Sequence, residues 1–337
     1  MFEGKTVLIT GGTGSLGNAL VERLLDLGIK QIRIFSRNEL KQIEMESKFN
    51  DDRLRFLVGD VRELPRVIRA TEDVDFVFHA AALKHVPKVE YNPFEAIKTN
   101  VQGSQNVIDA CLQNNVQKAI CIGTDKAVSP LNTYGATKLL MEKLFVTAQR
   151  YSNPKKHHTK FVAVRYGNVF GSSGSVIPKF IQQLKNKQKI TMTDSKMTRF
   201  NITMNEALDF ILKATLHAKG SEIFIPKLKS YILSDVKDAL IELLSDTGSE
   251  SIGIRPGEKL HESLINEDEI SQAFEYENMY VIIDPQYHHE GLEQIYPKIK
   301  KLDNVKKYSS DLAEKLSISE IKKLITDSGF LENHNKT

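Results

Sequence analysis

The chain has 337 residues, of which 41% are hydrophobic and 26% charged, so it can bury a full core as one large domain or two unequal ones. Its 46 basic and 43 acidic residues leave a formal net charge of +3, which argues against nucleic-acid binding but permits a local basic cleft for an anion. The two cysteines, Cys111 and Cys121, have no CxxC spacing, so we expect buried thiols in a reducing compartment, with no disulfide framework and no metal. No apolar run approaches the roughly 18 residues of a membrane span, and the first residues lack a signal-peptide pattern. We therefore expect a cytoplasmic protein without a membrane partner.

Short apolar runs alternate with helix-like segments through the first half of the chain. Strands are predicted at 5–10, 31–36, 53–60, 75–80, 118–123 and 161–169. Helices are predicted at 15–27, 38–49 and 94–115 and from about Tyr134 onward. The runs are nearly continuous in apolar residues, as in strands covered on both faces. This order predicts an α/β protein with a Rossmann-type doubly wound parallel sheet.

The regular alternation ends near residue 170. Helices are predicted at 175–188, 205–218 and 234–247, a strand at 222–226 and a short serine-capped helix at 317–329. We divide the chain into residues 1–170, a smaller α/β region over 171–285 that is partly interleaved with the first, and a polar tail over 286–337. His288 and His289 in the tail are expected to be solvated.

A glycine-rich turn, 10-TGGTGSLG-17, joins the first strand to the first helix. The glycines allow a tight turn and a close approach of the backbone to a pyrophosphate at a helix N-terminus. Glycine-rich turns are common, and it is this position in a βαβ unit that indicates a dinucleotide site. The expected contacts from the turn are Gly11, Thr13, Gly14, Ser15, Leu16 and Gly17.

The end of the second strand indicates which dinucleotide binds. An NAD site usually has an acid there, whereas this chain has Ser36 and Arg37, with Lys41 one helical turn further on. These cations suit the 2′-phosphate of NADP, although pairing of Arg37 and Lys41 with nearby glutamates is the alternative. Further contacts are expected to the adenine and to the ribose–nicotinamide half, from Asp60 and Val61 and from Ala80 and Ala81, respectively.

The stretch 123-GTDKAVSPLNTYGATK-138 contains the predicted catalytic residues. The fifth strand brings Thr124, Asp125 and Lys126 to the sheet edge where ligands bind in open α/β folds. Tyr134 and Lys138 are four residues apart on a helix that Asn132 would cap, and a lysine cation beside the phenol would favour the phenolate. YxxxK alone is a weak signal, and a half-buried tyrosine with a solvated lysine is the alternative.

Together with the glycine turn and Thr124, this pattern resembles the active site of the extended short-chain dehydrogenases/reductases. Asp125 and Lys126 add a second acid–base pair. If Tyr134 and NADP⁺ oxidise C4 of a nucleotide sugar, the C5 proton becomes acidic. Lys126 would remove that proton once burial or nearby cations lower its pKa, and Asp125, if protonated, would protonate the departing C6 hydroxyl.

Over roughly residues 3–270 the sequence resembles the UDP-N-acetylglucosamine 4,6-dehydratases, especially the C5-inverting type of pseudaminic acid synthesis. The motifs that carry the resemblance are TGGTGSLG (10–17), FSRNELK (35–41), GDVRE (59–63), HAAALKHVP (79–87), EYNPFEAIKTNVQGSQNV (90–107), TDKAVSP (124–130), YGATK (134–138), RYGNVFGS (165–172), GSVIP (174–178), MTRF (197–200) and IRPGEKLHE (254–262). Retaining relatives have Asp-Glu in place of Asp125-Lys126. The resemblance implies a lysine that acts on C5 and permits inversion.

The resemblance also implies a UDP-sugar site and a homo-oligomer, either a dimer or a hexamer. The implied substrate contacts are Lys84, Thr124, Asn168, Ser175, Val176, Pro178, Arg199, Arg255 and Glu258, and Lys84 and Asn100 are also implied to contact the cofactor. Two positions depart from the family: Ser173 replaces a usual arginine, and Gly123 replaces a usual serine. The first leaves open a changed sugar preference or the release of a 5,6-ene.

Several alternatives remain from sequence alone. They are a C5-retaining dehydratase, a 5,6-ene-releasing variant, a nucleotide-sugar epimerase that uses the same Tyr134–Lys138 pair, and a non-catalytic NADP sensor. A sensor would have no need for Tyr134, Lys138, Asp125 and Lys126 together.

Overall fold

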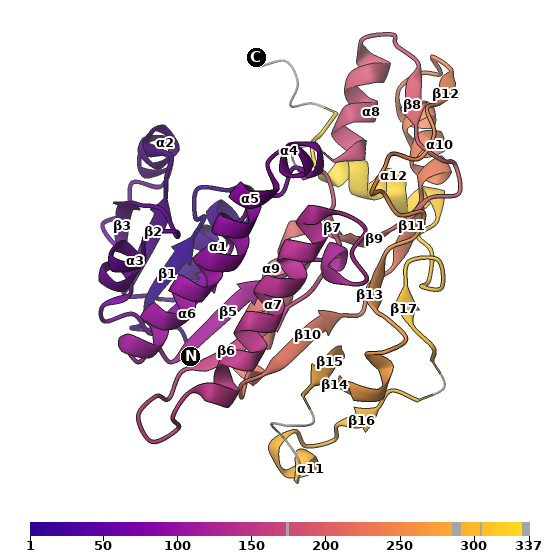
Figure 1. Cartoon of the computed structure of the whole chain (residues 1–337). Helices are drawn as coiled ribbons and strands as arrows, with labels where there is room; N and C mark the ends of the chain where they lie inside the picture. The colour runs from indigo at the N-terminus through magenta and orange to yellow at the C-terminus, as the bar shows by residue number, and fades with distance from the viewer. Residues whose placement is uncertain (173–174, 285–290, 304, 332–337) are drawn as a thin grey trace.

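A computed structural model describes residues 1–172, 175–284, 291–303 and 305–331 and has a ten-stranded sheet at its centre (Figure 1). The strand order is β16-β14-β15-β10-β6-β5-β4-β1-β2-β3. The parallel strands are β1 (Thr6–Thr10), β2 (Gln31–Ser36), β3 (Leu54–Val58), β4 (Phe76–His79), β5 (Lys118–Ile122), β6 (Lys160–Val164) and β10 (Glu222–Pro226). The order 3-2-1-4-5-6 is that of the doubly wound dinucleotide-binding fold, which confirms the predicted fold class.

Helices cover both faces of this sheet. The helices of the first half are α1 (Ser15–Asp26), α2 (Glu39–Phe49), α3 (Leu64–Thr71), α4 (Val86–Tyr91), α5 (Pro93–Ala96), α6 (Gly103–Gln113) and α7 (Thr133–Tyr151). Alternate residues of β1 enter different cores: Val7 and Ile9 pack with α1, and Leu8 packs with α6 and α7. Burial on both faces explains why the strands are nearly continuous in apolar residues.

The chain after residue 170 returns to the central sheet. β14 (Ala273–Tyr276), β15 (Met279–Ile283) and β16 (Lys300–Lys301) extend it in antiparallel fashion beyond β10. α9 (Met204–His217) packs against α1 on one face. The second half is therefore interleaved with the first, whereas the boundaries proposed at 170 and 285 stay a prediction.

A smaller third core lies at one end of the molecule (Figure 1). It forms around α8 (Val176–Lys185), α10 (Leu233–Leu243) and α12 (Ile318–Asp327). The small strands beside and below it are β7 (Asn168–Val169), β8 (Ile190–Met192), β9 (Thr198–Ile202), β11 (Ser230–Ile232), β12 (Ser249–Ser251), β13 (Ser263–Ile265) and β17 (Tyr308–Ser309). The remaining short elements are the 3-10 turns η2 (Asp125–Ala127) and η3 (Ile270–Gln272) and the helix α11 (Leu292–Ile295).

Two predicted elements are divided in the structure. The run 161–169 ends as β6 at Val164, and β7 then pairs with β9 in another sheet. At Gly167, between the two strands, a Cβ would lie 2.6 Å from the Phe200 side chain. The predicted helix 94–115 is α5, a π-helical turn η1 (Ile97–Gln102) and α6.

Other expectations concern single residues. Cys111 and Cys121 are free and buried. His288 and His289 lie outside the described residues. Of the helices that the structure describes, none has both the length and the apolar character to cross a bilayer.

Candidate active site

The glycine turn between β1 and α1 is shaped by two close approaches. Gly11 has φ +69°, and a Cβ there would lie 2.9 Å from the backbone of Ala81. A Cβ on Gly17 would lie 2.1 Å from the carbonyl oxygen of Gly12. Only glycine fits either position, which leaves the N-terminus of α1 bare beside the turn.

A cavity of about 290 Å³ opens beside this turn, at the carboxyl ends of β1 and β2. Its lining residues are Gly11, Thr13, Gly14, Phe35, Ser36, Arg37, Asn38, Lys41, Gly59, Asp60, Val61, Ala81, Ala82 and Thr99. The hydroxyl of Thr99 is buried without a hydrogen-bond partner among the described residues. A glycine cradle, two cations and an orphaned hydroxyl fit a dinucleotide.

Arg37 and Lys41 line this cavity, and the ion pair that the structure describes for Arg37 is with Asp60. Arg37 Nη1 lies 3.8 Å from Asp60 Oδ2. Asp60 is also held by Arg62, whose Nε and Nη2 donate to Oδ2 at 2.9 and 2.7 Å. The alternative pairing of Arg37 or Lys41 with Glu39 or Glu44 is not among the described ion pairs.

The loop that carries Lys84 is fixed by Asn100. The Asn100 amide oxygen accepts from Leu83 N at 2.7 Å, and its nitrogen donates to Leu83 O at 3.0 Å and Thr137 Oγ1 at 2.9 Å. Both the oxygen and the nitrogen of the Asn100 side chain are therefore hydrogen-bonded within the protein, and they hold the loop at Leu83 in place. Lys84 itself is exposed.

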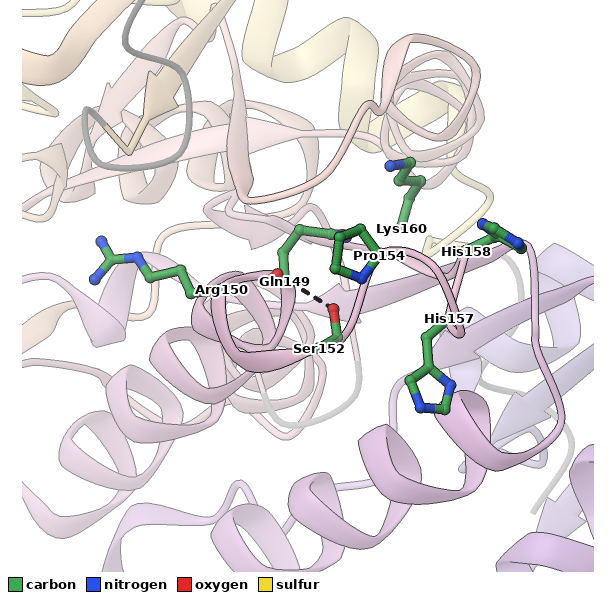
Figure 2. A pocket seen from close by; sticks show the side chains of 7 residues that line it. All are labelled: Gln149, Arg150, Ser152, Pro154, His157, His158 and Lys160. Atoms are coloured by element: carbon green, nitrogen blue, oxygen red, sulfur yellow. Dashed lines mark hydrogen bonds between the residues drawn. The ribbon is translucent and has the colours of Figure 1, made fainter.

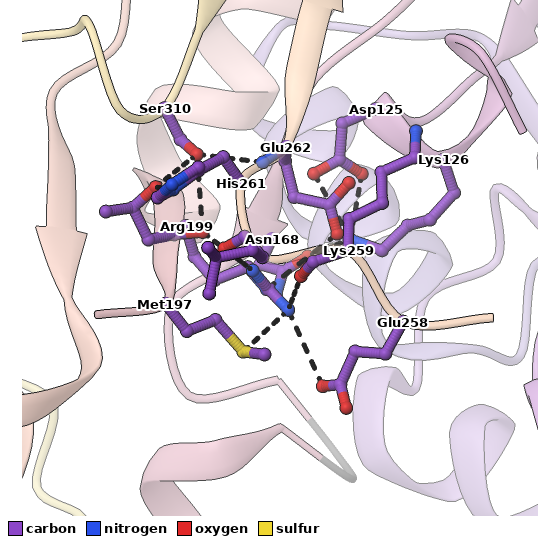
Figure 3. Close-up of polar contacts among 12 residues, drawn as sticks. Asp125, Lys126, Asn168, Met197, Arg199, Glu258, Lys259, His261, Glu262 and Ser310 are labelled. Carbon is purple, nitrogen blue, oxygen red and sulfur yellow. Dashed lines mark hydrogen bonds and ion pairs between the residues drawn. The ribbon is translucent and has the colours of Figure 1, made fainter. Parts of the chain in front are cut away.

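The end of β5 delivers Thr124, Asp125 and Lys126 into the turn η2, as predicted. Asp125 is fully buried, and Thr124 Oγ1 donates to its Oδ1 at 2.9 Å. Lys126 Nζ donates to both Asp125 oxygens, at 2.9 and 3.1 Å, and to Asn168 Oδ1 at 2.6 Å (Figure 3). A quarter of the Lys126 side chain (25%) stays exposed, whereas that of Asp125 is buried.

Gly123, just before this turn, marks one of the departures from the family. A Cβ at Gly123 would lie 2.5 Å from the carbonyl oxygen of Val164 in β6. The backbones of β5 and β6 approach too closely here for a serine side chain. Ser173, the other departure, lies outside the described residues.

The helix α7 places Tyr134 and Lys138 beside this turn, and Asn132 caps it as predicted by accepting from Gly135 N at 2.8 Å. Lys138 Nζ donates to Ile122 O at 2.6 Å and to Met141 Sδ at 3.2 Å, and its expected effect on Tyr134 stays a prediction. Burial raises the pKa of Tyr134 to about 12, while Lys126 and a hydrogen bond with Thr124 act to lower it. Tyr134 is therefore a neutral phenol here.

The lowered pKa on which the role of Lys126 as a base was made conditional is not found in this structure. Burial acts to lower this pKa, but the charges of Asp125 and Glu262 outweigh it and raise the pKa overall. Burial raises the pKa of Asp125 above its ordinary value, with Glu262 adding to the rise and Lys126 opposing it. The structure thus contains a cationic lysine hydrogen-bonded to a buried carboxyl group whose pKa lies above its ordinary value.

Of the implied substrate contacts, Asn168 and Arg199 lie in this cluster (Figure 3). Arg199 is buried on β9, donates to the carbonyl oxygens of Thr198 and Lys259 at 2.7 and 3.0 Å, and lies 3.5 Å from Glu258 Oε1. Others are placed by their elements: Ser175 precedes α8, Val176 and Pro178 lie in its first turn, and Arg255 is exposed in the segment leading to Glu258. The Ser175 hydroxyl is buried without a described partner.

Glu262 is the site residue that sequence reasoning missed. It is 3% exposed, and its Oε1 lies 3.5 Å from Lys126 Nζ and 3.8 Å from Arg199 Nε. It ends the motif IRPGEKLHE, which was the only signal available, and nothing in that motif shows that it lies beside Lys126.

A separate cavity of about 540 Å³ lies where α7 passes into β6, at the opposite edge of the sheet (Figure 2). It is lined by Gln149, Arg150, Ser152, Pro154, His157, His158 and Lys160. None of the predicted site residues lies there.

The doubly wound sheet, the glycine cradle and the Thr124–Tyr134–Lys138 constellation define an extended short-chain dehydrogenase/reductase. The chain belongs to the polysaccharide biosynthesis protein family, whose sequence profile matches residues 7–284.

Three similar proteins carry different names. A UDP-N-acetylglucosamine 4,6-dehydratase (inverting) of Campylobacter jejuni subsp. jejuni serotype O:23/36 (strain 81-176) is 49% identical over 284 residues, 84% of each chain. A UDP-glucose 4-epimerase of Rickettsia conorii (strain ATCC VR-613 / Malish 7) is 40% identical over 100% of this chain and 99% of the relative. The X-ray structure of Pen from Bacillus thuringiensis is 41% identical, superimposes with a TM-score of 0.89 and covers 98% of this chain and 99% of that one.

Proposed function

We propose that this protein is an NADP-dependent UDP-N-acetylglucosamine 4,6-dehydratase that inverts C5. The observation that carries the proposal is the Asp125–Lys126 pair, buried at the carboxyl edge of the sheet and close enough to Tyr134 for Lys126 to influence its pKa. The Campylobacter jejuni relative supports the substrate and the reaction. The product is UDP-2-acetamido-2,6-dideoxy-β-L-arabino-hex-4-ulose.

The cofactor assignment rests on the cavity at the end of β2. Arg37 and Lys41 line it, and no acid takes the place of Ser36. The residues that would hold the dinucleotide are the glycine turn, Asp60, Val61 and Ala81. When bound, NADP⁺ would supply the hydride acceptor for C4 and the hydride donor for C6 of the sugar.

The chain's own residues manage the protons. Tyr134 takes the proton of the 4-hydroxyl once a positive charge beside it lowers its pKa. Lys126 removes the C5 proton, and Asp125 protonates the 6-hydroxyl as it leaves as water. Lys126 must first lose its own proton, and the short contacts to Asp125 provide the path, because moving one proton from lysine to aspartate creates both the base and the acid.

A 4-epimerase is the second candidate, favoured by the Rickettsia relative, which matches the whole chain. An epimerase needs Thr124, Tyr134 and Lys138 but makes no use of an acid–base pair at C5 and C6. The buried Asp125–Lys126 pair therefore favours dehydration.

One incubation distinguishes these reactions: the protein, NADP⁺ and UDP-N-acetylglucosamine in D₂O, followed by proton NMR and mass spectrometry. We expect loss of water, one deuteron at C5 and coupling constants of the L-arabino configuration. A D-xylo product would exclude inversion, a 4-epimer would exclude dehydration, and an accumulating 5,6-ene would show that hydride return is incomplete. Tyr134→Phe, which removes the C4 base, serves as the inactive control.

A further inference from the structure

Asn132 uses both ends of its side-chain amide. Its Oδ1 accepts from Gly135 N at 2.8 Å and so caps α7, the helix that carries Tyr134. Its Nδ2 donates to the carbonyl oxygen of Gly257 at 2.8 Å, from a residue 125 positions away in the chain. These partners fix the orientation of the amide, because a backbone N–H needs an acceptor and a carbonyl oxygen needs a donor. Serine or aspartate caps a helix as well as asparagine does, so capping alone does not require the donor.

The partner of that donor lies in a tight turn formed by residues 255–258. Glu258 N donates to the carbonyl oxygen of Arg255 at 3.0 Å, and Gly257 has φ +78°. A proline at 256 followed by a glycine with positive φ is the pattern of a type II turn. The turn therefore sets where its two charged ends, Arg255 and Glu258, lie relative to each other.

The turn lies next to the catalytic residues (Figure 3). Glu258 Oε1 is 3.5 Å from Arg199 Nη2. Lys259, the next residue, donates through Nζ to the carbonyl oxygen of Val128, in the loop that follows Lys126. The 255–258 turn is thus tied to the stretch between Lys126 and α7 from both sides.

The free end of the turn carries a positive charge. Arg255 is exposed, and its guanidinium takes part in none of the described ion pairs. Burial lowers the pKa of Lys179 on α8, and the charge of Arg255 lowers it further against the opposite effect of Glu258. Arg255 and Lys179 therefore repel each other, and an anion such as a diphosphate would relieve that repulsion.

We propose that Asn132 is a positioning residue of the substrate site: its oxygen caps the helix of Tyr134 while its nitrogen holds the 255–258 turn, so that Arg255 meets the diphosphate of a UDP-sugar in register with the catalytic residues. The identity of the ligand rests on the proposed function. The hydrogen bond between Asn132 and the turn does not depend on it.

Asn132→Ser separates the two contacts of the side chain. Its hydroxyl still caps α7 but leaves the carbonyl oxygen of Gly257 without its donor, whereas Asn132→Ala loses both contacts. Amide hydrogen exchange with mass spectrometry measures the two segments in the NADP⁺-loaded protein. In Asn132→Ser we expect peptides over 253–262 to exchange about 10-fold faster and the start of α7 to keep its wild-type rate; in Asn132→Ala both exchange faster. An unchanged rate over 253–262 in Asn132→Ser would overturn the proposal.

The second test is the affinity for UDP, measured by isothermal titration calorimetry on the NADP⁺-loaded protein. Asn132→Ser should raise the Kd about 10-fold, because the loosened turn must be ordered when UDP binds. With UDP-N-acetylglucosamine as substrate, KM should rise by a similar factor and kcat should change less than about 3-fold, since the cap of α7 is kept. An unchanged Kd, or a fall in kcat without a rise in KM, would show that Asn132 acts on the helix alone.

The matched control is Asn266→Ser. Asn266 Oδ1 accepts from Glu269 N at 2.9 Å, and its Nδ2 donates to Ser129 Oγ at 3.4 Å. The same substitution therefore removes a contact to the same loop without touching the 255–258 turn. We expect this variant to bind UDP like the wild type.

Gly257→Ala tests the turn from its other side. Its positive φ disfavours any side chain, so we expect weaker UDP binding with unchanged exchange at the start of α7. This variant decides the proposal if Asn132→Ser fails to fold. A wild type that does not bind UDP would overturn the proposal together with its ligand. A wild type that binds UDP but forms no dehydrated product would overturn the reaction alone, and the UDP affinities of the variants would still decide the role of Asn132.

Discussion

Lys126 is a cation in the structure, yet the proposed reaction needs it as a base. Its Nζ is hydrogen-bonded to Asp125 and Asn168 and also faces Glu262. An ammonium with three oxygen partners does not lose its proton to water readily. The proton must move within the cluster when the substrate arrives, and the 2.9 Å contact to Asp125 is the shortest route to a carboxylate.

An arginine at position 126 would keep the positive charge of Lys126 and remove its ability to act as a base. Lys126→Arg retains a cation for Asp125 and Glu262 but cannot deprotonate. We expect it to bind the cofactor and to form reduced nicotinamide on addition of the sugar, while C5 exchange from D₂O falls about 10²–10⁴-fold. Lys126→Ala should lose the same exchange and retain cofactor binding, with lower stability because two buried carboxylates lose their cation.

The absorbance of reduced nicotinamide and the deuterium content at C5 are the two measurements. Tyr134→Phe is the comparison variant, since it stops the reaction before any reduced nicotinamide forms. Normal C5 exchange in Lys126→Arg would remove the lysine from the proposed mechanism.

The proposed preference for NADP depends on Arg37. Its guanidinium has one described contact, at 3.8 Å to Asp60, so it is available to a 2′-phosphate. Arg37→Gln should weaken NADPH binding about 10- to 100-fold, the value of a charge-assisted hydrogen bond, and leave NADH binding nearly unchanged. The enhancement of nicotinamide fluorescence measures both affinities in a chain without tryptophan.

Arg69→Gln is the matched control, because Arg69 is an exposed arginine that faces Glu72 on α3. It should bind both cofactors like the wild type. An equal loss of NADPH and NADH affinity in Arg37→Gln would mean that Arg37 supports the cavity without reading the phosphate.

At the scale of elements, the sequence predicted those helices, strands and turns whose formation depends on neighbouring residues. β1, α1 and the glycine turn follow from an apolar run and a spacing of glycines, and Asn132 caps α7 as its position before the helix indicated. The break between β6 and β7 was not predictable, because β7 pairs with β9 from the second half of the chain. The π-helical turn η1 interrupts a segment with ordinary helical periodicity.

The same distinction applies to the candidate site. Thr124, Asp125, Lys126 and Tyr134 come from one strand, one turn and the following helix, so sequence spacing places them. Glu262 reaches Lys126 only through the interleaved second half of the chain. The pKa of Lys126 is raised mainly by Asp125, its neighbour in the sequence, and further by Glu262, whose contact only the fold reveals.

At the scale of the whole molecule, one buried arginine joins the two halves. Arg165, at the end of β6, is fully buried and donates to Glu142 of α7 through Nε at 3.0 Å. It also donates to Glu269 at 2.9 and 3.0 Å and to the carbonyl oxygen of Leu264 at 2.8 Å. The helix that carries Tyr134 is thereby fixed to the segment that follows Glu262.

Removing this arginine should therefore lower the stability of the protein. Arg165→Met leaves Glu142 buried without its cation, and we expect the unfolding free energy to fall by about 3–5 kcal/mol. Arg23→Met, which breaks the exposed ion pair with Asp209, should cost under about 1 kcal/mol. Urea titrations followed by far-ultraviolet circular dichroism compare the two. Adding Glu142→Gln to Arg165→Met should recover part of the lost unfolding free energy, because the buried glutamate charge is then removed. If the double variant is as unstable as the single one, the packing of the Arg165 side chain, and not its charge, holds the two halves together.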